Sequence, residues 1–197
     1  EILQKKGGSS VDAAIAIMIC YSTVNPMSSG IGGGFFMTIY DTSSAKAYGI
    51  DARETAPGGA TEDMYLKSNA SSTTGGLSIA VPGEIRGFEV AHKQFGKLPW
   101  KELFQPSITL ARDGFTVSEH LADYMAGDKA KIQRDPDMRE AYTNPDTGEL
   151  YKRGEKIRLP KLADTMETIG EEGADAFYTG TLVKDIIADL NEKGSNS

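Results

Sequence analysis

Residues 8–40 read GSSVDAAIAIMICYSTVNPMSSGIGGGFFMTIY, a helical pattern followed by a glycine-rich turn and a strand. Ser9 or Ser10 can cap a helix that runs to about Val24, because apolar residues recur there at the spacing of one buried helix face. Further apolar residues predict that this helix is covered on most sides; they are Ala13, Ile17 and Cys20.

The glycine run 30–34 leads directly into a β-rich segment, residues 35–40. After a turn, residues 46–52 alternate in character and predict an antiparallel partner strand. A dinucleotide-binding loop is disfavoured, because that fingerprint follows a strand and opens a helix, the reverse of this order. The glycines instead predict unusual backbone angles or a close approach of the backbone between helix and strand.

The rest of the chain predicts mostly helices. No linker divides it, so we expect residues 1–197 to be part of a single domain of the α+β class. The expected elements are an extended run at 77–81, helices at 82–95, about 103–113, 118–132, 162–171 and 182–192, a loop at 144–148 and a short strand at 156–159.

The composition excludes several classes of protein. The 197 residues carry 21 Lys and Arg against 28 Asp and Glu, a formal net charge of −7, so we expect no nucleic-acid partner. The longest apolar run, 13–21, is about half of what a bilayer span requires. The start at Glu1 and the end just after a helical pattern lead us to expect an internal segment of a longer polypeptide.

The segment 51–57, DARETAP, follows the second predicted strand and places Arg53 where the chain leaves the sheet. A guanidinium presents a planar fork of donors that fits a carboxylate in two parallel hydrogen bonds. An exposed ion pair with Asp51 or Glu54 is the alternative interpretation, and it would contribute little energy.

Four other residues could carry chemistry. His92 lies on the apolar face of its predicted helix and is interpreted as structural, and His120 has no partner motif. No metal-ligand spacing surrounds either histidine or Cys20, so no metal site is expected. Cys20 is either a small buried residue or the partner of a cysteine upstream of residue 1. Asn69 begins the glycosylation sequon Asn-Ala-Ser in a polar stretch.

Five segments in order resemble the large subunit of γ-glutamyltransferase, and the resemblance covers nearly the whole chain. They are GSSVDAAIA at 8–16, GIGGGFF at 30–36, DARETAP at 51–57, GLSIAVPGEIRG at 76–87, and LPW at 98–100 with FQPS at 104–107. The sequon at Asn69 makes the chain resemble the animal, cell-surface branch of this family.

The resemblance implies an N-terminal nucleophile hydrolase with an αββα sandwich, of which this chain is the large-subunit portion. In this family a precursor cleaves itself, and a threonine at the new N-terminus attacks the γ-glutamyl amide of glutathione or its conjugates. Water, an amino acid or a dipeptide then accepts the γ-glutamyl group, and no cofactor takes part. A threonine hydroxyl can be activated by its own α-amine, so no histidine is required.

The same resemblance assigns roles to positions of this chain. It implies that the nucleophilic threonine and the small subunit lie beyond residue 197, so no catalytic residue is expected here. It implies that Arg53 holds the α-carboxylate of the γ-glutamyl group, and that the glycine run packs the first helix beside the sheet. We expect the protein at the extracellular face of the plasma membrane, with any anchor upstream of Glu1.

Two alternatives remain open from the sequence. One is a related N-terminal nucleophile amidase similar to cephalosporin acylase, although the motif around Arg53 favours a ligand with an amino-acid carboxylate. The other is a catalytically silent homologue that acts as a surface or interaction protein. A threonine at the self-cleavage junction would distinguish an enzyme from a silent homologue.

Overall fold

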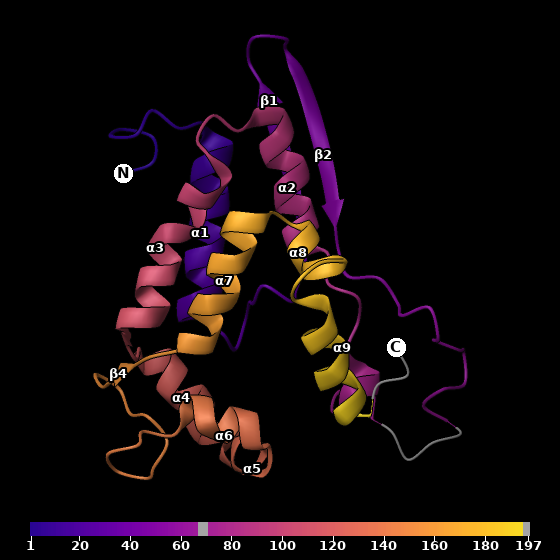
Figure 1. Ribbon diagram of the computed structural model, residues 1–197, viewed down its shortest axis with the longest axis vertical. Helices are drawn as coiled ribbons and strands as arrows, with labels where there is room; N and C mark the ends of the chain where they lie inside the picture. The colour runs from indigo at the N-terminus through magenta and orange to yellow at the C-terminus, as the bar shows by residue number, and fades with distance from the viewer. Residues whose placement is uncertain (67–70, 195–197) are drawn as a thin grey trace.

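The computed structural model describes residues 1–66 and 71–194. Within them, helices predominate and the longest sheet is the hairpin of β1 and β2 (Figure 1). The elements in chain order are α1 (Ser10–Val24), β1 (Phe35–Asp41), β2 (Lys46–Ala52), the 3-10 turn η1 (Gly76–Ser78), α2 (Glu84–Phe95), α3 (Trp100–Asp113), β3 (Phe115–Thr116), α4 (Glu119–Gly127), α5 (Lys129–Arg134), α6 (Pro136–Tyr142), β4 (Lys156–Ile157), α7 (Pro160–Glu172), α8 (Asp175–Tyr178) and α9 (Val183–Glu192).

Helix α1 begins as predicted, with Ser9 as its N-cap. The Ser9 hydroxyl accepts a hydrogen bond from the backbone N–H of Asp12, and the Asp12 carboxylate accepts one from the N–H of Ser9, a reciprocal capping box. The prediction that α1 is covered on most sides is wrong for the described residues, because Ile17 is 67% exposed and Tyr21 is 50% exposed. One face of α1 is therefore buried and the opposite face is open.

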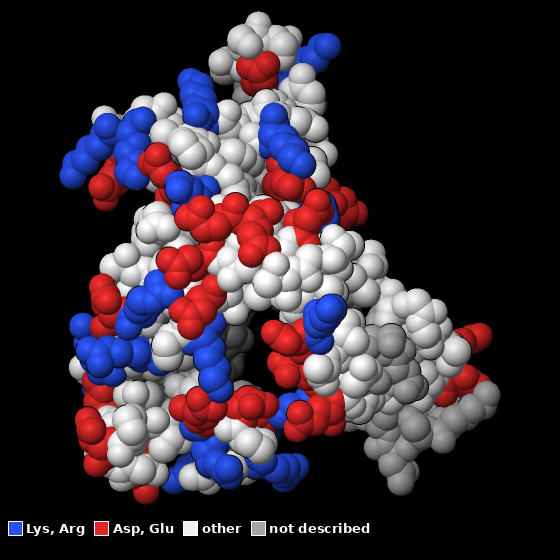
Figure 2. All heavy atoms as spheres, in the orientation of Figure 1, with Lys and Arg blue, Asp and Glu red and all other residues white. Residues whose placement is uncertain are grey.

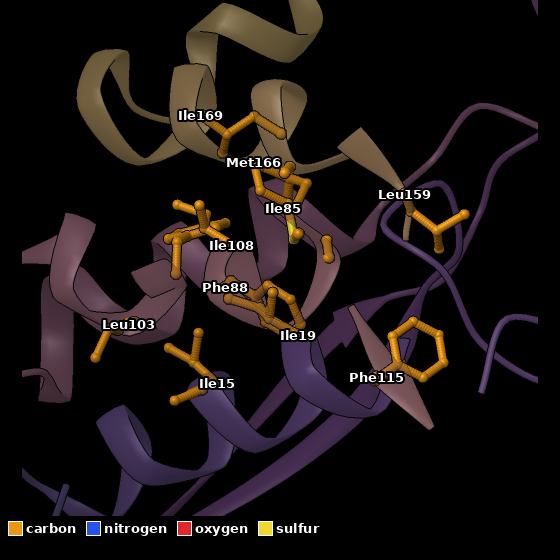
Figure 3. Packing of buried hydrophobic residues seen from close by; sticks show 14 of the residues in the cluster. Ile15, Ile19, Ile85, Phe88, Leu103, Ile108, Phe115, Leu159, Met166 and Ile169 are labelled. Atoms are coloured by element: carbon orange, nitrogen blue, oxygen red, sulfur yellow. The ribbon is translucent and has the colours of Figure 1, made fainter. Parts of the chain in front are cut away.

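The core lies between α1, α2, α3 and α7. Helix α3 packs against both α1 and α7, and α2 lies against α1 and β2. Figure 3 shows side chains from these helices converging, and fully or almost fully buried examples are Ile15, Ile19, Ile85, Phe88, Leu103, Ile108, Met166 and Ile169. Burial of this apolar surface is the main favourable contribution to folding.

The hairpin pairs β1 and β2 in antiparallel register, with Phe35 opposite Ala52. One face lies against α2, where the ring of Phe35 stacks on Phe88 with 4.9 Å between centroids. On the other face, Phe36 and Tyr40 are 72% and 63% exposed. The hairpin is thereby held on α2, so that the end of β2 lies beside the start of α2 and beside α8 (Figure 1).

Three predicted elements differ from the observed ones. The helix expected at 118–132 is broken into α4 and α5 at Asp128, because Gly127 is a poor helix former and the chain turns there. The expected extended run at 77–81 begins as η1, and within it Val81 forms a β-bridge with Thr55. The predicted strand at 156–159 contributes only Lys156–Ile157 to a sheet.

Positive and negative side chains are mixed over the face shown in Figure 2, where acidic residues gather across the middle. Exposed ion pairs join many of them, as where Arg112 contacts Asp164 and Glu167 from α3 to α7. In the part of the chain that the structure describes, no helix has the length and apolar character needed to cross a bilayer.

Candidate functional site

Arg53 directly follows the last residue of β2, as the sequence predicts. Its backbone N–H donates a hydrogen bond of 3.0 Å to the Asp51 carboxylate. Two residues later, Thr55 exchanges backbone hydrogen bonds of 3.2 and 2.8 Å with Val81, on the segment that leads into α2. The backbone that carries Arg53 is therefore attached on both sides, while its side chain is 55% exposed.

Glycines clamp the backbone at this point. A Cβ on Gly34 would lie 3.0 Å from the Arg53 Cα and closer still to the carbonyl oxygen of Ala52, and a Cβ on Gly83 would also strike that carbonyl. The carbonyl of Gly33 accepts hydrogen bonds of 3.0 Å from the backbone N–H groups of Gly83 and Glu84. Only glycine allows the glycine run and the start of α2 to close on the strand end in this way.

The predicted close approach of the glycine run is thus confirmed, with two corrections. The turn packs the end of β2 against α2, and not α1 against the sheet. In the run 30–34 no glycine has a positive φ, so backbone proximity is what requires Gly34, and not an unusual backbone angle.

A groove of about 380 Å³ runs along this strand end, between β2, α2 and α8. Its lining includes Arg53, Thr55, Val81, Arg86 and Tyr178. The Arg86 guanidinium is committed to neighbours: it lies 2.7 Å from both Glu89 and Asp175 and stacks 4.9 Å from the ring centroid of Tyr178. Arg53 is the freer of the two guanidinium groups that line the groove.

The contacts of Arg53 are compatible with both interpretations, an ion pair with a neighbouring carboxylate and a guanidinium that binds a carboxylate ligand. Its Nη1 lies 3.2 Å from Oε2 of Glu54, so the expected ion pair exists. Within the described chain this contact leaves the Nε and Nη2 edge of the guanidinium without a partner, and that edge can hold a carboxylate through two parallel hydrogen bonds.

A buried carboxyl that the sequence did not predict lies beside this site. Glu84, the first residue of α2, is only 2% exposed, and the Ser22 hydroxyl lies 3.4 Å from its Oε1. Burial raises the pKa of Glu84 to about 7, the hydrogen bond from Ser22 opposes this rise, and the nearby Glu54 carboxylate adds to it. An acidic residue in the first turn of a helix usually serves the helix dipole at the surface, so no local signal marks this one.

The remaining candidate residues lie away from the groove around Arg53. His92 is structural, as predicted: its Nε2 lies 2.8 Å from the carbonyl oxygen of Leu98. Cys20 is a half-buried free thiol that accepts a hydrogen bond of 3.0 Å from the Ser107 hydroxyl. A partner upstream of residue 1 stays a prediction. The ring of His120 packs edge-on against that of Tyr124, with 5.0 Å between centroids.

Two further expectations concern the glycosylation sequon and a metal site. Asn69, which begins the sequon, lies outside the described residues. Among residues 1–66 and 71–194, no three His, Cys, Asp or Glu side chains are grouped so that they could hold a metal ion.

Solved structures share this fold. The crystal structure of Helicobacter pylori gamma-glutamyltranspeptidase superposes with a TM-score of 0.91 at 28% identity, covering 98% of this chain and 56% of that one. Cephalosporin acylase from Bacillus halodurans superposes with a TM-score of 0.86 at 27% identity, covering 99% of this chain and 37% of that one. The chain has the α+β fold of the N-terminal nucleophile hydrolases.

The sequence comparisons identify the family within this class. The family model described as gamma-glutamyltranspeptidase matches residues 1–196. Scoloptoxin SSD14 of Scolopendra dehaani is 46% identical over 190 residues, covering 96% of this chain and 33% of the relative. Glutathione hydrolase 3 of Arabidopsis thaliana is 45% identical over 190 residues, covering 96% and 30%. The chain belongs to the γ-glutamyltranspeptidase family, and it spans about a third of the length of these relatives.

Proposed function

We propose that this chain is the large-subunit portion of an enzyme that transfers or hydrolyses the γ-glutamyl group of glutathione and its conjugates. Arg53 carries the proposal, because its free guanidinium edge at a groove suits a carboxylate ligand. Membership of the γ-glutamyltranspeptidase family and relatives named glutathione hydrolase support it.

In this proposal, Arg53 binds the α-carboxylate of the γ-glutamyl group and orients its amide toward a nucleophile supplied from outside residues 1–197. That nucleophile is a threonine freed by cleavage of a common precursor, on a small subunit that packs against this chain. Water, an amino acid or a dipeptide accepts the γ-glutamyl group. Holding the substrate in one orientation lowers the barrier by reducing the entropy that the reaction must lose.

The proposal extends to the location of the protein. The sequon at Asn69 supports a glycosylated protein at the extracellular face of the plasma membrane. Peptide mapping for a glycan at Asn69 and surface labelling of intact cells test these two points.

A second candidate is an amidase similar to cephalosporin acylase, which the superposition on that enzyme favours. The two candidates differ in what Arg53 recognises, because a γ-glutamyl ligand has an α-carboxylate for it to bind. Arg53→Ala in the full-length protein tests the choice with a γ-glutamyl anilide. The proposal expects KM to rise, because Arg53→Ala leaves the bound α-carboxylate without its partner. The cost is about 2–5 kcal/mol where the bound ligand and the small subunit exclude water from the pair, and less than about 1 kcal/mol where the pair stays in water. Unchanged kinetics would refute it.

A further inference from the structure

The buried carboxyl of Glu84 links three segments of the molecule. Its side chain projects from the start of α2, where the Ser22 hydroxyl of α1 lies 3.4 Å from Oε1. Ser22 in turn lies 2.7 Å, between hydroxyl oxygens, from Ser29 in the segment before the glycine run. A carboxyl so placed lies directly behind the turn that clamps the strand end of Arg53.

Glu54 approaches the same turn from the other side. A Cβ built on Gly33 would lie 3.3 Å from Oε2 of Glu84 and 3.7 Å from Oε1 of Glu54. The two carboxyls therefore converge on the space that Gly33 leaves open. The other oxygen of Glu54, Oε2, is buried and accepts no hydrogen bond from the described residues, although Nη1 of Arg53 lies 3.2 Å away. Glu54 is thus held beside Arg53 by charge and not by a directed hydrogen bond.

Resting on the function proposed above, we propose that Glu84 is a positioning residue for Arg53. Neutral Glu84 leaves the Glu54 carboxylate in place beside the guanidinium, so that the free edge of Arg53 faces the groove. Ionised Glu84 sets a second negative charge near Glu54, and the two like charges repel each other. It also adds negative charge behind the groove, which opposes an incoming carboxylate. Both effects weaken ligand binding.

The surroundings of Glu84 place its ionisation in an accessible pH range. Glu54 faces it from the segment after β2, Tyr178 of α8 is near enough to interact electrostatically, and Ser22 of α1 supplies a neutral hydroxyl. Burial is the largest cause of its raised pKa of about 7. If only the neutral form is competent, apparent affinity falls with the fraction of that form, about tenfold between pH 6 and pH 8.

The test compares wild type with Glu84→Gln in the full-length protein, measuring kcat and KM for a γ-glutamyl anilide from pH 5.5 to 8.5. Glutamine keeps the shape of the side chain and stays neutral. The ratio of wild-type KM to Glu84→Gln KM should rise about tenfold from pH 6 to pH 8, with the two kcat profiles parallel. A purely structural residue would give a ratio that does not change with pH, and this result would overturn the proposal.

Three further variants complete the design. Glu102→Gln removes an exposed carboxylate of α3, which pairs with Lys6 at 2.8 Å, and should follow wild type at every pH. Ser22→Ala removes the hydrogen bond that favours ionised Glu84, so the KM step should move to higher pH. This variant keeps the proposal falsifiable if Glu84→Gln does not fold, and an unmoved step would count against it. Arg53→Ala separates the two ideas: unchanged KM refutes the proposed function, whereas raised KM with a flat wild-type-to-Glu84→Gln ratio refutes only the role of Glu84.

Discussion

Asp12 should be among the most costly positions to change, although it does not line the groove. Its carboxylate is fully buried, and Oδ2 accepts backbone hydrogen bonds from Ser9 at 2.7 Å, Lys97 at 3.0 Å and Leu98 at 3.2 Å. It therefore joins the start of α1 to the loop between α2 and α3. Asp12→Ala removes half of the capping box, worth about 1 kcal/mol. It also leaves the Lys97 and Leu98 N–H groups without an acceptor, at about 1–3 kcal/mol each. We expect a total loss of about 3–7 kcal/mol in the free energy of unfolding.

Urea unfolding of the full-length protein, followed by far-UV circular dichroism, measures this loss. Hydrogen exchange on a peptide spanning residues 96–99 locates it, because the amides of Lys97 and Leu98 should lose protection. Asp123→Ala, an exposed position on α4, is the matched control and should change stability by less than about 0.5 kcal/mol. Unaltered protection at 97–98, together with a stability loss no larger than that of the control, would refute this reasoning.

Two other predictions concern the glycine turn and the carboxyl behind it. Glu84 stays protonated in the folded protein to about pH 7 but ionises near pH 4.5 when unfolded. The contribution of this group to the free energy of unfolding therefore falls as pH rises from about 4.5 to 7 and is constant above. Glu84→Gln should therefore stabilise the protein by about 3 kcal/mol at pH 8 and by almost nothing at pH 4, as thermal unfolding at both pH values would show; equal shifts would contradict this. Gly34→Ala should cost about 2 kcal/mol or more in a denaturant titration, because its methyl group would strike the Ala52 carbonyl. Gly32→Ala, with open space around its Cβ, should be nearly neutral, and similar losses for both variants would show that the clamp is not the cause.

Local sequence signals predicted the elements that local chemistry determines. The serine cap and apolar spacing gave α1 its correct bounds, and alternation gave the two strands of the hairpin. Gly127 separates α4 from α5 within one continuous apolar pattern, so its effect was missed. The open face around Ile17 could not be predicted, because periodicity shows which residues could be buried and not what is present to cover them.

For the candidate site too, local features could be predicted from the sequence and features set by tertiary contacts could not. The place of Arg53 at the strand end was predicted, because a charged residue after a strand is visible in the sequence, and its role stays a prediction from the resemblance to a family. The clamp between Gly34 and Ala52 was anticipated only as a close approach, since its partners are set by tertiary packing. Glu84 was missed because its partners Ser22 and Glu54 are far from it in sequence. Long-range contacts of this kind leave no periodic pattern.

The most direct test of the central claim pairs a change in Arg53 with a change in the ligand. In the full-length protein, kcat/KM is measured for a γ-glutamyl anilide and for the 4-aminobutanoyl anilide, which lacks only the α-carboxylate. If Arg53 binds that carboxylate, wild type should prefer the first substrate by about 30-fold or more, from a charge pair worth about 2–5 kcal/mol. Arg53→Ala should lose nearly all of this preference, while Arg112→Ala, which removes a partly exposed arginine on α3, should keep it. An Arg53→Ala enzyme that still prefers the γ-glutamyl substrate as strongly as wild type would contradict the account.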